Sequence, residues 1–365
     1  MSEQPITRRP HAVNPSIESA RVILAVKNFA SIPGVCHIGL GVTATNTHRV
    51  LRRHGVHCET LSAQTSKELY LKLEAEERKS GDRPVTHVVI SAPSWVQPVS
   101  FADFSRRWPN TEFVQLNHSG TAYLSIDRYG VKNILEVSDL ARTVHNVRVA
   151  GNNPRFTRWL NDAYGTPELL LPNLYDTSTF IDPVVQRQNY DPLRVGSFGA
   201  GRPWKNQLTA AEAAVTLARR LNVTLEFHVN SMRPDGGEKM IVARNEMFDK
   251  LPRATRIEVP WALWPAFLKV VEGQDILISP SHDETFCVIV ADGIARGVPS
   301  VVTAAMEWTP KSWQADGHDP ASVTSVAMGL LYDRVGAVHD GRRALNAFVA
   351  DGIQRWLAYL SGGQA

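Results

Sequence analysis

Short apolar runs alternate with helical patterns along almost the whole chain. The helical pattern is clearest in 207–221, where apolar residues recur near every third or fourth position. Alternation of strands and helices is typical of parallel sheets covered by helices on both faces. The runs that predict strands are 22–26, 57–61, 87–91, 113–116, 147–150 and 169–171 in the first half, and 193–198, 223–229, 275–279 and 300–303 in the second.

The pattern divides the chain into two similar halves that are joined once. The segment 176–191 is rich in Pro and Asp and is the best candidate linker. We expect a loose polar arm over 1–19, a Rossmann-like domain over 20–180 and a second one over 181–340. Two doubly wound domains joined in this way predict a central cleft. Ligands of such sheets bind beyond the carboxyl ends of the strands.

Composition adds few constraints. Of the 365 residues, 43% are apolar and 21% are charged, which is typical of a globular protein. The net charge of +3 is too small to indicate nucleic-acid binding. The three cysteines have no metal-ligand spacing. We find neither a long apolar run nor a secretory signal, so we expect a cytoplasmic protein.

The segment 280–302 carries the strongest candidate chemistry. A predicted strand delivers Glu284 to a loop at its carboxyl end, and a helix is predicted over Phe286–Ala295 with Thr285 as its cap. The backbone N–H groups near Phe286 and Cys287 would then be free to bind a phosphate.

A second acid follows Glu284 on the same predicted helix. Asp292 lies eight residues later, about two helical turns away. A carboxylate at that depth could accept hydrogen bonds from ribose hydroxyls, as acids do in dinucleotide folds. Glu284 and Asp292 together would suit a bound sugar nucleotide.

A basic loop follows the first strand of the second half. Gly196, Gly199 and Gly201 let the backbone come close to a ligand, and Arg202 and Lys205 follow them. A diphosphate gains negative charge as it leaves, and fixed cations that meet this charge lower the barrier.

These two segments resemble the retaining GT-B glycosyltransferases often called glycosyltransferase group 1, or GT4-like. The matching positions in the acidic segment are Pro280, Ser281, Glu284, Phe286, Asp292, Ala295, Gly297 and Pro299. Two positions depart from the family pattern, because Asp292 replaces a Glu and Cys287 replaces a Gly.

The resemblance implies a GT-B fold and transfer of a sugar from a nucleotide-diphosphate donor. It implies that Glu284 positions the donor sugar, that Arg202 and Lys205 hold the diphosphate, and that stereochemistry at the transferred sugar is retained. The sequence has no Asp-x-Asp motif, so we expect no metal and no other cofactor.

The first half matches the family less specifically. Gly39 and Gly41 precede a predicted helix over 43–54 and resemble the family's glycine loop, which contacts the donor. His118 lies at the tip of a predicted strand, where family members often carry a His that faces the donor sugar. The resemblance also implies that the final segment, 341–365, is a helix that crosses back onto the first domain.

Several alternatives stay open at this point. A GT-B-like nucleotide-binding protein without transferase activity and a sugar-nucleotide epimerase both fit the fold. An NAD-dependent dehydrogenase fits poorly, because no complete Gly-x-Gly-x-x-Gly follows a strand. The acceptor is also open and could be a glycan, a lipid-linked sugar, a small metabolite or modified DNA. The sequence does not indicate an oligomeric state.

Overall fold

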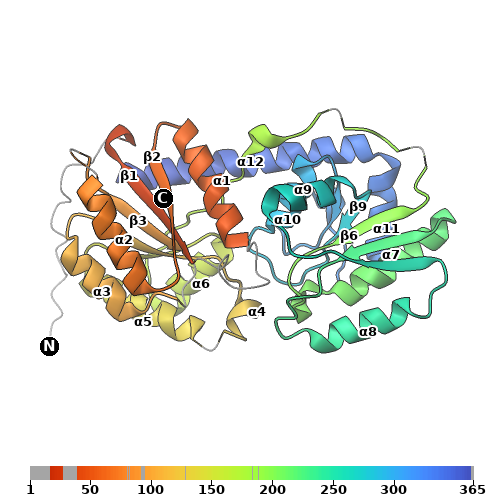
Figure 1. Cartoon of the computed structure of the whole chain (residues 1–365), viewed down its shortest axis with the longest axis horizontal. Helices are drawn as coiled ribbons and strands as arrows, with labels where there is room; N and C mark the ends of the chain where they lie inside the picture. Colours follow the sequence, from red (N-terminus) through yellow and green to blue (C-terminus); the bar gives the residue numbers. More distant parts are fainter. Residues whose placement is uncertain are drawn as a thin grey trace.

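The computed structural model contains two parallel β-sheets, each covered by helices (Figure 1). It describes residues 17–27, 39–79, 81, 83–91, 95–127, 129–182, 184–187 and 189–362. Most of the predicted arm lies outside the described residues, and its last part forms a 3₁₀ turn at Ile17–Ser19. The predicted fold class, two Rossmann-like α/β domains, is confirmed.

The first sheet has the strand order β2-β1-β3-β4-β5. Its central strands are buried on both faces: Val22 and Leu24 of β1 point into one core, and Ile23 and Ala25 into the other. The strands are β1 (Arg21–Lys27), β2 (His57–Ala63), β3 (His87–Ser91), β4 (Glu112–Asn117) and β5 (Val147–Gly151). The helices are α1 (Gly39–Arg53), α2 (Ser66–Lys79), α3 (Pro98–Arg107), α4 (Thr121–Leu124), α5 (Gly130–Thr143) and α6 (Pro154–Tyr164).

The second sheet has the order β10-β9-β6-β7-β8. The order of the strands reverses at β6, because β7 and β8 follow on one side of it and β9 and β10 on the other, with β9 next to β6. Such a reversal is where doubly wound sheets bind ligands. The strands are β6 (Leu193–Ser197), β7 (Leu225–Val229), β8 (Ala254–Glu258), β9 (Ile276–Ile278) and β10 (Ser300–Val301). The helices are α7 (Gln207–Leu221), α8 (Glu238–Phe248), α9 (Trp264–Glu272), α10 (Val288–Ala295) and α11 (Pro320–Tyr332).

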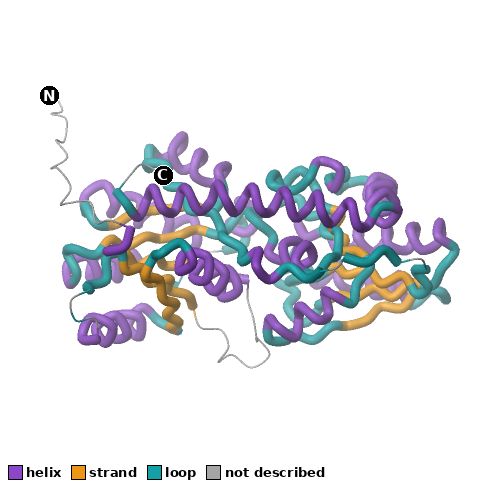
Figure 2. The backbone as a smooth tube through the Cα atoms, turned by 90° about the horizontal axis from the view of Figure 1, so that it is seen from above, coloured by secondary structure: helices purple, strands orange, loops and turns teal. Residues whose placement is uncertain are grey.

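The last helix, α12 (Arg334–Leu360), joins the two halves a second time. Its 27 residues span about 40 Å and lie along both domains in two perpendicular views (Figures 1 and 2). Leu345 and Val349 pack into the core of the second sheet, whereas Trp356 and Leu360 pack into a core of the first. The helix therefore contributes to the hydrophobic cores of both domains.

Two local predictions were wrong. The helix predicted from Phe286 begins at Val288, because Cys287 has a left-handed backbone with φ of 60° and ends the preceding loop. Gly39 and Gly41 do not form a loop but lie in the first turn of α1. Gly39 faces α10, since a Cβ added to it would lie 3.5 Å from Cγ1 of Val288.

Candidate functional site

The loops after β6 and β9 meet at the reversal point of the second sheet. Lys205, in the 3₁₀ turn Pro203–Lys205, donates a hydrogen bond from Nζ to Oε1 of Glu284. Both side chains are largely buried, with 14% of Lys205 and 9% of Glu284 exposed. Burial is the largest single influence on the pKa of Lys205 and lowers it, but the charge of Glu284, the hydrogen bond to Glu284 and the nearby Cys287 together outweigh burial, so the pKa of Lys205 is raised. The two groups therefore form a buried ion pair.

Arg202 lies nearby but is held by other groups. Its Nε and Nη2 atoms each lie 3.1 Å from Oδ2 of Asp235, and its guanidinium lies 4.8 Å from the ring centre of Tyr123. Arg233 shares the same carboxylate, with Nη2 3.0 Å from Oδ2, and lies over the ring of Trp261. A diphosphate that binds Arg202 must therefore compete with Asp235.

The start of α10 presents backbone donors beside two close-packed glycines. In the described part of the chain, the N–H groups of Val288 and Ile289 have no hydrogen-bond acceptor. A Cβ added to Gly199, whose φ is +112°, would lie 3.4 Å from Cδ1 of Ile289. Gly39, at the start of α1, lies against Val288 from the other domain. The first turns of two helices and a glycine loop therefore meet here, an arrangement that favours an anion.

Phe286 and Thr285, which precede α10, have different roles from those predicted for their side chains. The ring of Phe286 is buried and stacks on Trp308 and Phe348, with ring centres 5.4 Å and 5.3 Å away. Thr285 does not cap α10. Its Oγ1 donates to the backbone oxygen of His118 at 3.1 Å and accepts from Nδ2 of Asn152 at 3.2 Å. Thr285 therefore connects the two domains.

His118 follows β4 in the first domain and is neutral. Asn152 donates to its Nδ1 at 3.3 Å, which leaves the Nε2–H to donate to Oγ of Ser91 at 3.3 Å. Burial lowers the pKa of His118 to about 4. The imidazole is therefore a neutral hydrogen-bonding group at the contact between the domains.

Asp292 is buried and has hydrogen-bond partners other than Lys205 and Glu284. Its Oδ1 accepts hydrogen bonds from the hydroxyl of Tyr175 at 2.8 Å and from Nε1 of Trp264 at 3.1 Å. The residue is 1% exposed, and burial raises the pKa of its carboxyl to about 7 although both hydrogen bonds oppose the shift. One oxygen of the carboxylate that we expected to face ribose is thus hydrogen-bonded twice within the protein.

Sequence reasoning missed the residues of the first domain that reach this region. Asn152, Asn153 and Arg155 all contact the loop that carries Glu284. The Asn153-Pro154 pair is a recognisable helix start. Nothing local marks Arg155, because its partners are brought to it only by the packing of the two domains.

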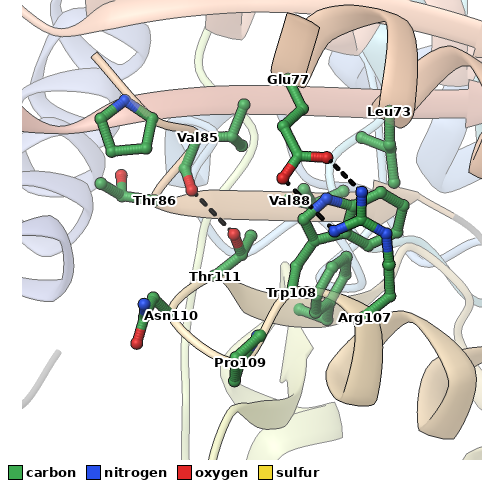
Figure 3. A pocket seen from close by; sticks show the side chains of 12 residues that line it. Leu73, Glu77, Val85, Thr86, Val88, Arg107, Trp108, Pro109, Asn110 and Thr111 are labelled. Carbon is green, nitrogen blue, oxygen red and sulfur yellow. Dashed lines mark hydrogen bonds and ion pairs between the residues drawn. The ribbon is translucent and has the colours of Figure 1, made fainter. Parts of the chain in front are cut away.

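A cavity lies elsewhere, at the amino ends of β3 and β4 (Figure 3). Its volume is about 220 Å³, Leu73 and Trp108 line it, and Arg107 pairs with Glu77 at 2.7 Å on its rim. None of the predicted site residues lines this cavity. Within the described residues, no group of three His, Cys, Asp or Glu side chains is placed to hold a metal ion, and no helix could span a membrane.

The two facing Rossmann-like domains, with their loops in contact at the strand ends, define the GT-B fold. Neither a protein-family model nor a curated protein sequence matches the chain. Solved structures do match it over nearly its full length. Sucrose-phosphate synthase from Thermosynechococcus elongatus has 14% identity and a TM-score of 0.63, over 93% of this chain and 98% of that one.

Two further solved structures contain nucleotides. The catalytic domain of starch synthase IV from Arabidopsis thaliana, bound to ADP and acarbose, has 10% identity and a TM-score of 0.63, over 94% of this chain and 99% of that one. Anabaena HepE, in complex with UDP and glucose, has 14% identity and a TM-score of 0.57, over 94% and 97%. At these identities the similarity shows the fold.

Proposed function

We propose that the protein is a glycosyltransferase that moves a sugar from a nucleoside-diphosphate donor to an acceptor. The observation that carries the proposal is the buried pair of Lys205 and Glu284, which lies at the reversal point of the second sheet. The similar structures with bound UDP or ADP support a nucleotide donor. The sequence match around Glu284 supports the retaining, GT4-like subclass.

The proposed mechanism uses Lys205 and the start of α10 to hold the diphosphate. The unpaired N–H groups of Val288 and Ile289, the backbone around Cys287 and the Gly199 loop would receive its oxygens. Lys205 is protonated and would stabilise the negative charge that develops as the glycosidic bond breaks. Arg202 would add a second cation after exchanging Asp235 for the phosphate.

Glu284 is the proposed contact to the transferred sugar. Lys205 holds one of its carboxylate oxygens, so the side chain has a fixed direction before any donor binds. Its negative charge would stabilise positive charge at the anomeric carbon, an interaction that strengthens in the transition state. His118 is neutral and both of its ring nitrogens have partners, so it would contribute a hydrogen bond to the sugar only by exchanging Ser91 or Asn152 for it.

A glutamate substitution tests the proposal. Glu284→Gln keeps an oxygen for Lys205 but removes the negative charge, so kcat should fall about a hundredfold or more. The affinity for nucleoside diphosphates should change little, because their proposed contacts are intact. The donor is first identified by thermal shift with UDP, GDP, ADP and their sugars, since a ligand at ~100 times its Kd adds about 2.7 kcal/mol.

The matched control for Glu284→Gln is Glu212→Gln, which changes an exposed acid on α7. Turnover by a folded Glu284→Gln protein that equals the turnover of this control would contradict the assignment.

We also propose that transfer needs no divalent metal. Lys205, Arg202 and the start of α10 supply the positive charge that a metal ion would otherwise provide. Turnover should therefore persist in EDTA. Loss of turnover in EDTA that manganese or magnesium restores would overturn this part of the proposal.

A second candidate function is a nucleotide-binding protein that transfers no sugar. The observation in its favour is that Arg202 and Asp292 already have partners within the protein. If the protein binds the nucleotide but does not release the sugar with any acceptor class or with water, this candidate is favoured over the transferase.

A further inference from the structure

The loop that carries Glu284 is hydrogen-bonded to the first domain at three consecutive residues. Oδ2 of Asp283 accepts from the backbone N–H of Ala122 at 2.8 Å. The backbone oxygen of Glu284 accepts from Nη2 of Arg155 at 2.9 Å. Oγ1 of Thr285 donates to the backbone oxygen of His118 at 3.1 Å. The position of this loop therefore depends on contact between the two domains.

Arg155 makes the most extensive of these contacts. Besides the oxygen of Glu284, its Nη2 donates to the backbone oxygen of Ala305 at 2.8 Å, and its Nε lies 3.3 Å from Oε1 of Glu307. One guanidinium thus joins the loop after β9 to the loop after β10. A planar group with five donors can hold several acceptors in a fixed geometry.

The helix that carries Arg155 is itself tied to the same loop. Asn153 caps α6 by accepting from the backbone N–H of Arg155 at 2.8 Å. Its Nδ2 donates to the backbone oxygen of Thr285 at 3.3 Å. The start of α6 and the Glu284 loop therefore form one hydrogen-bonded unit across the two domains.

The contact at Asp283 requires a glycine opposite it. A Cβ added to Gly120 would lie 2.2 Å from Oδ2 of Asp283, closer than any real contact. The φ of Gly120 is −79°, which any residue adopts, so the glycine is needed for the close approach and not for its backbone conformation.

We infer that Arg155 is a positioning residue that holds the Glu284 loop in its working position when the two domains are in contact. The inference rests on the proposed function, because it gives this contact a role in turnover. Separation of the domains breaks the bonds to Asp283, Glu284 and Thr285 together. The pair of Lys205 and Glu284 lies within the second domain and does not need Arg155. Nucleotide binding to the second domain can therefore precede the contact between the Glu284 loop and the first domain.

The test compares Arg155→Met and Arg155→Lys with Arg158→Met, which changes an exposed arginine on the same helix. In Arg155→Met, kcat should fall about ten- to a hundredfold, because small displacements of a reacting group have effects of this size. The Kd for UDP, GDP or ADP should stay within about threefold of the wild type. Arg155→Lys keeps the charge and some of the donors, so it should recover part of kcat.

Hydrogen exchange at Ala122 reports on the contact without any turnover. The N–H of Ala122 is protected by Asp283, on the other domain, and does not touch Arg155. Its exchange should be faster in Arg155→Met and unchanged in Arg158→Met. Gly120→Ala breaks the contact at Asp283 by steric overlap and should reproduce the loss of kcat while Arg155 is intact.

Two results would overturn the inference: wild-type exchange at Ala122 in Arg155→Met, or wild-type kcat in both Arg155→Met and Gly120→Ala. A wild-type protein with no turnover on any sugar nucleotide would count against the proposed function. In that case, faster exchange at Ala122 in Arg155→Met would still support the contact that Arg155 makes.

Discussion

The buried carboxyl group of Asp292 makes the stability of the folded protein depend on pH. Its pKa is about 7 in the folded protein, against 3.8 for an ordinary aspartate, and burial is the main cause. Tyr175 and Trp264 donate to it, and Arg296 is the nearby cation. The folded protein therefore binds this proton more tightly than the unfolded chain does.

The sign of the pH effect follows from this difference. The contribution of Asp292 to stability is fully present below about pH 4 and is lost as the pH rises through about 7. Asp292→Asn keeps an oxygen for Tyr175 but cannot ionise. Between about pH 5.5 and 8.5, the free energy of unfolding of the wild type should therefore fall by about 2 kcal/mol more than that of the variant.

Urea denaturation at the two pH values measures this difference. Asp351→Asn, at an exposed position on α12, is the control and should follow the wild type. Equal pH dependence in the wild type and in Asp292→Asn would show that the carboxyl group titrates normally.

At the scale of single residues, sequence patterns indicated candidate site residues but not which of them touch. Lys205 and Glu284 lie 79 positions apart, and they meet because β9 pairs with β6. That pairing depends on the order of strands in the sheet, which the spacing of residues does not reveal. The partners of Asp292 were also unpredictable, since Tyr175 lies 117 positions before it in the chain, outside any strand.

At the scale of elements, α10 begins with an unusual backbone. Cys287 has φ of 60° and ψ of 80°, a left-handed conformation that is unfavourable for residues with a Cβ. The GT4-like pattern has a glycine at this position, and the structure gives a physical reason for that choice. The side chain of Cys287 is buried, so its packing offsets part of the cost of the strained backbone.

Substitutions at Cys287 should reverse the usual order of alanine and glycine. Glycine normally costs about 0.5–1 kcal/mol relative to alanine inside an element. At this φ, Cys287→Gly should instead be more stable than Cys287→Ala by about 1 kcal/mol, because only glycine relieves the strain. Thermal or chemical denaturation of the two variants gives the comparison. A more stable alanine variant would mean that the left-handed backbone is not adopted.

Prediction of the elements succeeded where side chains are buried on a regular pattern. Strands β1 and β3 of the first sheet are enclosed by two cores and appear in the sequence as continuous apolar runs. Strand β8 was missed because it lies at the edge of its sheet and none of its side chains is fully buried. Its sequence, Ala-Thr-Arg-Ile-Glu, therefore carries little apolar signal.

At the scale of the whole molecule, the two-domain architecture followed from the alternation of strands and helices. The contacts between the domains did not, because they join residues more than a hundred positions apart through loops of irregular structure. Arg155 and Asp283 make contacts of this kind between the domains. Their importance depends on a fit between surfaces that no local pattern encodes.

The course of α12 has a consequence for synthesis of the protein on the ribosome. Trp356 is 1% exposed, donates from Nε1 to the backbone oxygen of Pro172 at 2.9 Å, and fills a core whose other members include Val22 and Leu24. The ribosome makes those strands first and Trp356 much later. At roughly 5–20 residues per second, the delay is on the order of tens of seconds. During that time the nascent first domain exposes the apolar surface that α12 later covers. Exposed apolar surface of this kind is what ribosome-associated chaperones bind.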